Sequence, residues 1–185
     1  QGACGLVVLP ETTAEVVACM RRAAELGLAV VPRGSGTGLT GGAVPLDDAV
    51  VVSLARMTAI LEVDPETPCA RVQPGVLNLD LSVAVAHLGL HYAPDPSSQQ
   101  ACSIGGNVAT NAGGPHCLAS GVTSQHVLEV EMVLHDGEVL RRGGLAPDGP
   151  GYDLRGLVVG GEGTLGVVTE VVVRLMRTPP HVTTM

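Results

Sequence analysis

The stretch VVPRGSGTGLTGG, residues 30–42, decides how this sequence folds. Its β-branched run ends at Pro32, and a loop rich in glycine and hydroxyl side chains follows at once. Five glycines within the nine residues 34–42 would cost conformational entropy for no gain in a plain surface loop. Because glycine carries no Cβ, such a loop can instead turn its N–H groups inward and form an anion-binding nest. Arg33 is the only basic residue of the stretch, so we expect backbone donors to hold the phosphate of a nucleotide cofactor.

Two segments, GTGLTG at 36–41 and GEGTLG at 161–166, match the pattern G-x-G-x-x-G of Rossmann dinucleotide-binding folds. That fold needs a helix that begins at the glycines, so that the helix N-terminus meets the pyrophosphate. The first segment is followed by Pro45 and an apolar run at 49–52, which indicates a loop and then a strand. The second is followed by VVTEVVV at 167–173, which indicates a strand. We therefore exclude a Rossmann fold at both places, and without a following Gly-Lys-Ser/Thr neither segment is a Walker P-loop.

The composition bounds the class of protein. The 185 residues predict one domain, with two lobes that share a core. The sequence has no Phe or Trp and only 2 Tyr, so Val, Leu, Ala and Ile must build that core, which favours strands. A net charge of −8 argues against nucleic-acid binding. No apolar run approaches the ~20 residues that a membrane span needs.

Neither the cysteines nor the histidines predict a metal site. The 5 cysteines form no CxxC pair, and we expect free thiols in a reducing compartment. Cys102 and Cys117 are expected to be small buried hydrophobic residues. His87 and His91 lie four residues apart, but Gly89 ends the helical pattern between them. We therefore predict no bound metal.

The first lobe, residues 1 to about 65, reads as a β-α-β unit. Thr12 and Glu15 fit a capping box at the start of its helix, which is expected to run to Leu26 and stop at Gly27. The glycine loop then follows a strand directly, at the end of a sheet where α/β proteins bind ligands. The strands expected in this lobe are 6–9, 28–31 and 49–54.

The second lobe, residues from about 66 to 185, reads as more antiparallel. Its clearest feature is a hairpin in which 127–134 turns at Asp136-Gly137 and returns through 138–141. The other expected elements are a helix at 78–88 that stops at Gly89, a stiff loop at 93–98, a short helix within 103–114 that glycines end, a short helix capped by Asp153, and a long last strand at 165–176.

Five segments occur in one order along the chain: PRGSGTGLTGG at 32–42, QPG at 73–75, PDPSS at 94–98, residues 102–114, and GEGTLG at 161–166. Together they resemble the FAD-binding domain of the vanillyl-alcohol oxidase / p-cresol methylhydroxylase (PCMH) superfamily. Within it, the chain is most similar to the FAD-linked subunits of bacterial glycolate oxidases, with D-lactate and D-2-hydroxyglutarate dehydrogenases as near relatives. The resemblance covers essentially the whole chain. It implies an α+β fold with a small βαβ lobe, a larger and mostly antiparallel lobe, and FAD between them.

The resemblance also implies which residues hold the cofactor. The loop 33–42 would wrap the pyrophosphate, and the segments 94–98, 102–114 and 161–168 would line the ribityl chain, flavin and adenine. Covalently flavinylated members carry a histidine where this loop has Thr37, so non-covalent FAD is implied. The candidate cofactor-binding residues are Pro32, Arg33, Gly34, Ser35, Gly36, Thr37, Gly38, Leu39, Gly41, Gly42, Pro74, Gly75, Pro94, Asp95, Ser98, Ser103, Ile104, Gly105, Asn107, Thr110, Asn111, Gly113, Gly114, Glu162, Gly163, Gly166, Val167 and Val168.

Several of these residues also have an ordinary structural interpretation. Asp95 lies between two prolines and suits a turn about as well as a functional site. Thr110 and Asn111 suit capping and turn chemistry equally well, whereas we favour flavin contact for Ser103 and Asn107. A further candidate is His116, for which a structural role is the favoured interpretation. Gly161 stands where related sequences often have serine, which removes one possible hydroxyl contact.

The implied activity is oxidation of a small 2-hydroxy acid, glycolate to glyoxylate foremost, with hydride transfer to flavin N5. In this family a C-terminal substrate domain faces the flavin, and we expect the proton-abstracting base and the carboxylate-binding arginines there, outside this chain. No catalytic residue is therefore named. A short N-terminal segment is also expected to be missing.

Alternatives remain open at this point. Within the same fold the substrate could be D-lactate, D-2-hydroxyglutarate or a sugar lactone. Another class is a non-catalytic FAD subunit that relays electrons to a partner, and a third is a scaffold whose glycine loop binds no nucleotide. The resemblance further implies other oxidase subunits, including an iron–sulfur electron acceptor, and a cytoplasmic location with membrane association only through such partners.

Overall fold

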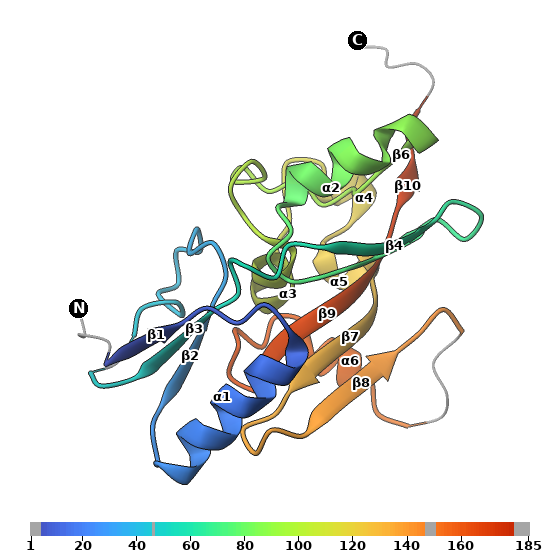
Figure 1. Cartoon of the computed structure of the whole chain (residues 1–185). Coiled ribbons are helices and arrows are strands. Elements are labelled where there is room, and N and C mark those ends of the chain that lie inside the picture. Colours follow the sequence, from blue (N-terminus) through green and yellow to red (C-terminus); the bar gives the residue numbers. More distant parts are fainter. Residues whose placement is uncertain (1–4, 46, 147–150, 180–185) are drawn as a thin grey trace.

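The computed structural model describes residues 5–45, 47–146 and 151–179. It contains a small parallel sheet and a larger antiparallel sheet, connected and covered by short helices (Figure 1). This is the α+β arrangement expected from the sequence. Neither glycine segment opens a helix: residues 38–45 form bends and turns, and Gly166 leads directly into a strand. The fold is therefore not a Rossmann fold.

The small sheet has three parallel strands in the order β1 (Leu6–Val8), β3 (Val50–Ser53) and β2 (Val30–Arg33). The helix α1 (Thr13–Glu25) connects β1 to β2.

Two polar contacts and one glycine set the ends of α1. The Thr12 side chain accepts a hydrogen bond from the Glu15 amide at 3.2 Å, which confirms the expected N-cap. The Glu15 carboxylate, however, accepts from the Glu11 amide at 2.7 Å rather than from Thr12, so only half of the expected capping box forms. At the other end Gly27 takes a φ of 65°, as a helix stop requires.

The large sheet has five antiparallel strands in the order β4, β5, β9, β7 and β8. Their bounds are β4 (Ile60–Asp64), β5 (Cys69–Val72), β7 (Val127–Val133), β8 (Val139–Gly143) and β9 (Val167–Arg174). The hairpin expected at 127–141 is present as β7 and β8, with Gly137 at a φ of 81° in its turn.

The two sheets divide earlier in the chain than the expected lobe boundary near residue 65. That boundary assigned residues 60–64 to the first lobe, but they form β4 and pair with β5 in the large sheet. The change from one sheet to the other therefore falls between Ser53 and Ile60.

The remaining helices are short and lie mostly in the second half of the chain. They are α2 (Asn78–Val85) with the 3₁₀ turn η1 (Ala86–Leu88), α3 (Ile104–Thr110), α4 (Cys117–Ser120), α5 (Thr123–His126) and α6 (Leu154–Val158). A two-stranded sheet pairs β6 (Leu90–His91) with β10 (Met176–Arg177).

The structure corrects two element boundaries. Asn111, at a φ of 47°, ends α3, where a glycine stop was expected. The single strand expected at 165–176 is instead β9 and β10, interrupted at Leu175, whose amide donates to the Pro68 carbonyl at 2.8 Å. Other ends agree: Gly89 caps η1 in the left-handed conformation, and the Asp153 side chain accepts from the Gly156 amide at the start of α6.

Two hydrophobic clusters hold these layers together. The larger one joins α2 and α3 to the large sheet, through buried residues that include Leu81, Val108 and Val171. The smaller one contains Val16 of α1, Val52 of β3 and Val167 of β9, so it includes both sheets. The two lobes therefore share a core.

The cysteines are only partly as expected. Cys69 and Cys102 are buried free thiols, and Cys19 is half-buried. Cys117, expected to be a small buried hydrophobic residue, is exposed. Across the described residues there is no group of three metal-ligating side chains and no helix long and apolar enough to cross a membrane.

Candidate functional site

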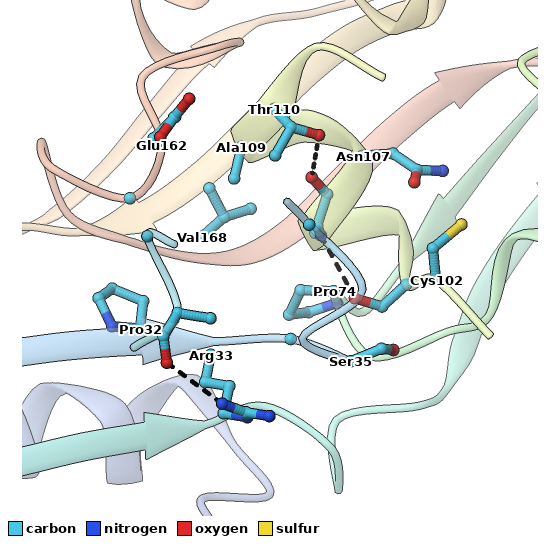
Figure 2. Close-up of a pocket in the computed structure, with 18 of the residues that line it drawn as sticks. Pro32, Arg33, Ser35, Pro74, Cys102, Asn107, Ala109, Thr110, Glu162 and Val168 are labelled. Carbon is cyan, nitrogen blue, oxygen red and sulfur yellow. Dashed lines mark hydrogen bonds between the residues drawn. The ribbon is translucent and has the colours of Figure 1, made fainter. Parts of the chain in front are cut away.

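A pocket that is open to solvent lies between the glycine loop, α3 and the turn that precedes β9 (Figure 2). Residues 32–43 form one wall, α3 forms a second, and residues 161–168 form a third. The floor includes apolar side chains such as Leu54, Met132 and Val168. The pocket therefore combines a glycine-rich rim with an apolar interior, which suits a ligand that has both phosphate and aromatic ring systems.

The glycine loop offers backbone donors to this pocket. None of the amides of residues 34–42 donates a hydrogen bond to another described residue. Gly36 takes a φ of 72° and Gly41 a φ of 84°, values that an L side chain rarely adopts. A Cβ on Gly38 would meet only Thr110 Cγ2, at 3.9 Å, so the missing side chain keeps open the space between the loop and α3.

The wall formed by α3 is fixed by contacts within the protein. The Ser103 side chain accepts from the Gly106 amide at 3.3 Å and caps the helix, while the Thr110 hydroxyl donates to the Gly106 carbonyl at 3.0 Å (Figure 2). The Ile104 and Gly105 amides donate to carbonyls of the preceding segment, each at 2.8 Å. The N-terminus of α3 is thus already saturated, and the free anion donors belong to the glycine loop.

The third wall is a strained turn. Glu162 is a non-glycine residue at a φ of 51°, and its amide donates to the Ala109 carbonyl at 2.8 Å. Next to it Gly163 has a φ of 75°, and a Cβ there would lie 3.4 Å from the Pro32 ring. Strain of this kind is retained where the surrounding structure fixes it, and it is common at ligand sites.

Charge is sparse in the pocket. Among its described lining residues, only Arg33 and Glu162 are charged. An anionic ligand would therefore be held mainly by the free amides of the loop. These amides, the bare glycine edges and the apolar floor fit FAD, whose pyrophosphate needs donors and whose rings need apolar contact.

One polar side chain of this region is left without a partner. Asn107 is 1% exposed and its Nδ2 has no hydrogen-bond acceptor among the described residues. It contacts Cys102, and burial raises the pKa of the Cys102 thiol, which the side chains of Ser98 and Asn107 offset in part. Both residues line the pocket and are buried.

Most of the candidate residues from the sequence lie around this one pocket, although their contact with FAD stays a prediction. Those that line it are Pro32, Arg33, Gly34, Ser35, Gly36, Thr37, Gly38, Gly42, Pro74, Ser98, Ser103, Gly105, Asn107, Thr110, Glu162, Gly163, Gly166 and Val168. Those that do not are Leu39, Gly41, Gly75, Pro94, Asp95, Ile104, Asn111, Gly113, Gly114 and Val167.

The residues outside the lining have other environments. Leu39 is fully exposed, whereas Ile104 and Val167 are fully buried in the two cores. Asn111 ends α3, and its side chain accepts from the Ser124 amide at 2.9 Å.

Gly114 and His116 pack against Asp95, which is itself a candidate. Its carboxylate contacts Nδ1 of His116 at 2.5 Å, and a Cβ on Gly114 would collide with the Asp95 carbonyl. His116, for which a structural role stays the favoured interpretation, makes this contact with a largely exposed ring.

The list of candidate residues left out several lining residues. Four of them lie outside the segments expected to line the cofactor: Ala43, Leu54, Met132 and Val158. The others lie within those segments but were not singled out: Thr40, Pro96, Cys102, Gly106, Ala109, Ala112, Gly161 and Leu165. For Cys102, Gly106 and Ala109 a signal existed, because they recur at helical spacing with Gly105 and form one face of the segment around α3. Leu54 and Met132 come from the ends of strands in different sheets, and nothing local in the sequence indicates that they meet.

Comparison with known proteins identifies the family of this chain. Residues 5–143 match the family described as FAD binding domain. The chain is 54% identical over 175 residues to glycolate oxidase subunit GlcD of Escherichia coli K12, which covers 95% of this chain and 35% of the relative. It is 47% identical to GlcD of Bacillus subtilis, with 94% and 37% covered, and 42% identical to a D-lactate dehydrogenase of Archaeoglobus fulgidus, with 92% and 38% covered.

A solved structure of alkyldihydroxyacetonephosphate synthase superposes with a TM-score of 0.85 at 25% identity, over 95% of this chain and 32% of that one. The chain thus spans little more than a third of the length of these curated relatives. Because the family match includes the glycine loop, α3 and most of the large sheet, the chain belongs to the FAD binding domain family, and its cofactor is FAD.

Proposed function

We propose that this chain is the FAD domain of a flavoenzyme that oxidises a small 2-hydroxy acid, with glycolate as the substrate and glyoxylate as the product. The observation that carries the proposal is the pocket between the glycine loop and α3, in a chain 54% identical to a glycolate oxidase subunit. Bound FAD supplies the hydride acceptor for such an oxidation. The residues of this chain bind and orient it and form an apolar floor that limits water.

The residues that line the pocket indicate which parts of the reaction this chain can support. Oxidation of a 2-hydroxy acid removes a hydride from carbon and a proton from oxygen, and the carboxylate must be held meanwhile. The only charged residues among the described lining of the pocket are Arg33 and Glu162. We therefore place the base and the carboxylate-binding groups in a further domain of the full-length protein, beside the two-lobed FAD domain.

The test is anaerobic reduction of the full-length protein. Glycolate should bleach the flavin absorbance, and D-lactate and D-2-hydroxyglutarate should do so more slowly. Faster bleaching by D-lactate would transfer the proposal to a D-lactate dehydrogenase, an activity that two of the relatives carry by name. No bleaching by any 2-hydroxy acid, with reduction only through a partner protein, would favour an electron-relay subunit.

We propose that the FAD is held non-covalently. Thr37 lines the pocket at the position where covalently attached members of the superfamily have histidine, and a threonine hydroxyl forms no such bond to flavin. Acid precipitation of the full-length protein should leave the yellow colour in the supernatant. Colour that stays with the pellet would refute this attachment.

We propose further that the protein is cytoplasmic and works with other oxidase subunits, one of them an iron–sulfur electron acceptor. Two of the curated relatives given above are named as subunits of an oxidase, which supports such an assembly. Affinity purification of the full-length protein from its own cells should recover a partner with the absorbance of an iron–sulfur cluster. Recovery of the flavoprotein alone, with full dye-linked activity, would contradict it.

A further inference from the structure

We propose that Arg33 is a positioning residue that locks the glycine loop into its FAD-binding shape and makes no contact with the pyrophosphate. Arg33 is the basic residue of the pocket lining, so a direct charge contact is the obvious expectation. Its geometry points elsewhere. The inference rests on the assignment of the pocket to FAD and concerns how that pocket is built.

The loop needs something to hold it. Its amides make no hydrogen bond to other described residues, and five of the nine residues 34–42 are glycine. Such a segment is free to sample many conformations in the absence of ligand. The conformation that binds FAD would then be a minor state. The apparent affinity for FAD would be the intrinsic affinity multiplied by the fraction of the protein in that conformation.

The Arg33 guanidinium connects the two ends of this loop. Its Nη1 donates to the Ala43 carbonyl at 3.2 Å, which joins the residue before the loop to the residue after it. Arg33 itself is fixed in β2, where it pairs with Ser53, and its carbonyl accepts from the Leu54 amide at 2.9 Å. The backbone of Arg33 is therefore held in the small sheet, and its side chain reaches across the loop to Ala43. We call this hydrogen bond between Arg33 and the Ala43 carbonyl the latch.

The same guanidinium supports the turn at Gly36. A Cβ built on Gly36 would lie 2.5 Å from Nη2 and 3.0 Å from Cζ of Arg33. The guanidinium thus packs directly against the bare Cα of Gly36, at the residue whose φ of 72° reverses the loop. Only glycine allows both the positive φ and this close packing.

The direction of the side chain excludes a simple contact role. In Figure 2 the guanidinium points away from Thr110, Asn107 and Glu162, and the dashed bond to the loop lies on the opposite side from α3. Arg33 lines the pocket, but its guanidinium group donates to the Ala43 carbonyl of the loop. Preorganisation of this kind raises affinity by lowering the cost of ordering.

The test compares Arg33→Lys with Arg33→Met in the full-length protein freed of FAD. Lysine keeps the positive charge of Arg33 but loses the planar guanidinium group, and methionine loses both. If Arg33 positions the loop, both variants lose that function. If Arg33 contacts the phosphate directly, the lysine variant keeps that contact. We expect both variants to bind FAD about tenfold more weakly, as loss of a charged hydrogen bond implies. Arg22→Lys is the matched control, because among the described residues Arg22 forms a salt bridge only with Glu25, on an exposed face of α1.

The deciding readout is made without any cofactor. Amide hydrogen exchange of residues 34–45 in the apoprotein should be at least about tenfold faster in both Arg33 variants, while β9 stays protected as the control for folding. Weaker FAD binding with unchanged exchange in the loop would establish a direct contact and overturn the proposal. Wild-type affinity in Arg33→Lys would overturn it as well.

A double-mutant cycle with Gly36→Ala gives an independent check. In the wild type the new Cβ would displace the guanidinium, so alanine should cost both backbone strain and the latch. In Arg33→Met only the strain remains, and the loss of FAD affinity caused by Gly36→Ala should be several-fold smaller. Additive losses would show that the two residues act separately. If the wild type and Arg22→Lys both failed to bind FAD, the assignment of the pocket would fail instead of the latch.

Discussion

Gly38 and Gly36 look alike in the sequence but have different roles in the structure. A positive φ at both is the simple expectation for such a loop, and it holds only for Gly36. At Gly38 the backbone tolerates a side chain, and the space in front of it belongs to the pocket, with Thr110 Cγ2 on the far side. A side chain at Gly38 would therefore occupy ligand space without straining the loop.

A size series at Gly38 should separate FAD binding from folding. Gly38→Ala leaves an ordinary 3.9 Å contact to Thr110 Cγ2 and should weaken FAD binding only slightly. Gly38→Val fills the gap and should weaken it at least about tenfold, with the melting temperature of the apoprotein unchanged within about 2 °C. Flavin fluorescence titration and apoprotein melting curves measure the two effects. A folded Gly38→Val protein with wild-type affinity would contradict the placement of FAD beside Gly38.

The cysteines should react with alkylating agents in an order that follows their burial. Cys117 is exposed, whereas burial raises the pKa of Cys102 and so lowers its thiolate fraction at neutral pH. Among the four described cysteines, iodoacetamide at pH 7 should label Cys117 first and Cys102 far more slowly. Peptide mass spectrometry gives the order, and added FAD should slow Cys102 further while it leaves Cys117 unchanged. Labelling of Cys102 first would mean that the part of the pocket beside Cys102 is accessible to solvent.

At the scale of elements, Glu131 joins three parts of the fold. It lies on β7 and is 5% exposed. Its carboxylate accepts from the Thr13 hydroxyl of α1 at 2.9 Å and from the Thr169 hydroxyl of β9 at 2.8 Å. Arg141 of β8 contacts it at 2.6 Å. A buried carboxylate of this kind is stable because every oxygen has a donor.

Glu131→Ala should destabilise the chain by about 2 kcal/mol. The full loss on breaking a buried ion pair is about 3–5 kcal/mol, and here it is reduced because the Arg141 side chain is half exposed. Glu131→Gln keeps acceptors for both threonines and should cost less. Urea unfolding gives the values, with Glu25→Ala on the exposed face of α1 as the control that should change stability by less than about 0.5 kcal/mol. An equal effect at Glu25 and Glu131 would contradict the role of the buried contact.

The sequence predicted where helices begin and end better than it predicted which strands pair with one another. Thr12, Gly89 and Asp153 each cap a helix end through contacts within a few residues, so the sequence shows them directly. Residues 60–64 carry no such information about which sheet they join, because β4 is fixed by its cross-strand contacts with β5. The expected lobe boundary near residue 65 therefore did not anticipate that these residues join the large sheet.

The candidate site shows the same division. The glycine loop has a local signature, since its composition alone indicates a backbone nest. Met132 and Leu54, in contrast, reach the pocket only because β7 and the segment after β3 meet in the shared core. Ser103 and Thr110 line the pocket, yet their hydroxyls are bonded to the backbone of α3 itself.

At the scale of the molecule, the pocket lies where two sheets are held in fixed relation. The smaller core contains Val50 and Val52 of the small sheet together with Val133 and Val167 of the large one. Because these residues pack into one cluster with α1, the strands next to the glycine loop and to the turn before β9 are anchored in the same core. A preformed gap of this kind binds an elongated cofactor without a large ordering cost.

The last prediction is that this chain, loaded with FAD, does not oxidise a substrate by itself. Hydride transfer requires the substrate carbon to be held about 3–3.5 Å from the acceptor atom in the right orientation. Among the described lining residues only Arg33 and Glu162 carry charge; the first is bonded to Ala43 and the second would repel a carboxylate. Residues 1–185 reconstituted with FAD should therefore keep their colour when glycolate or D-lactate is added without oxygen, while dithionite still reduces the flavin. The full-length protein should bleach with at least one 2-hydroxy acid under the same conditions. Turnover by the 185-residue chain with a dye as acceptor would place the substrate site within this domain, and the separate substrate domain would then be an error.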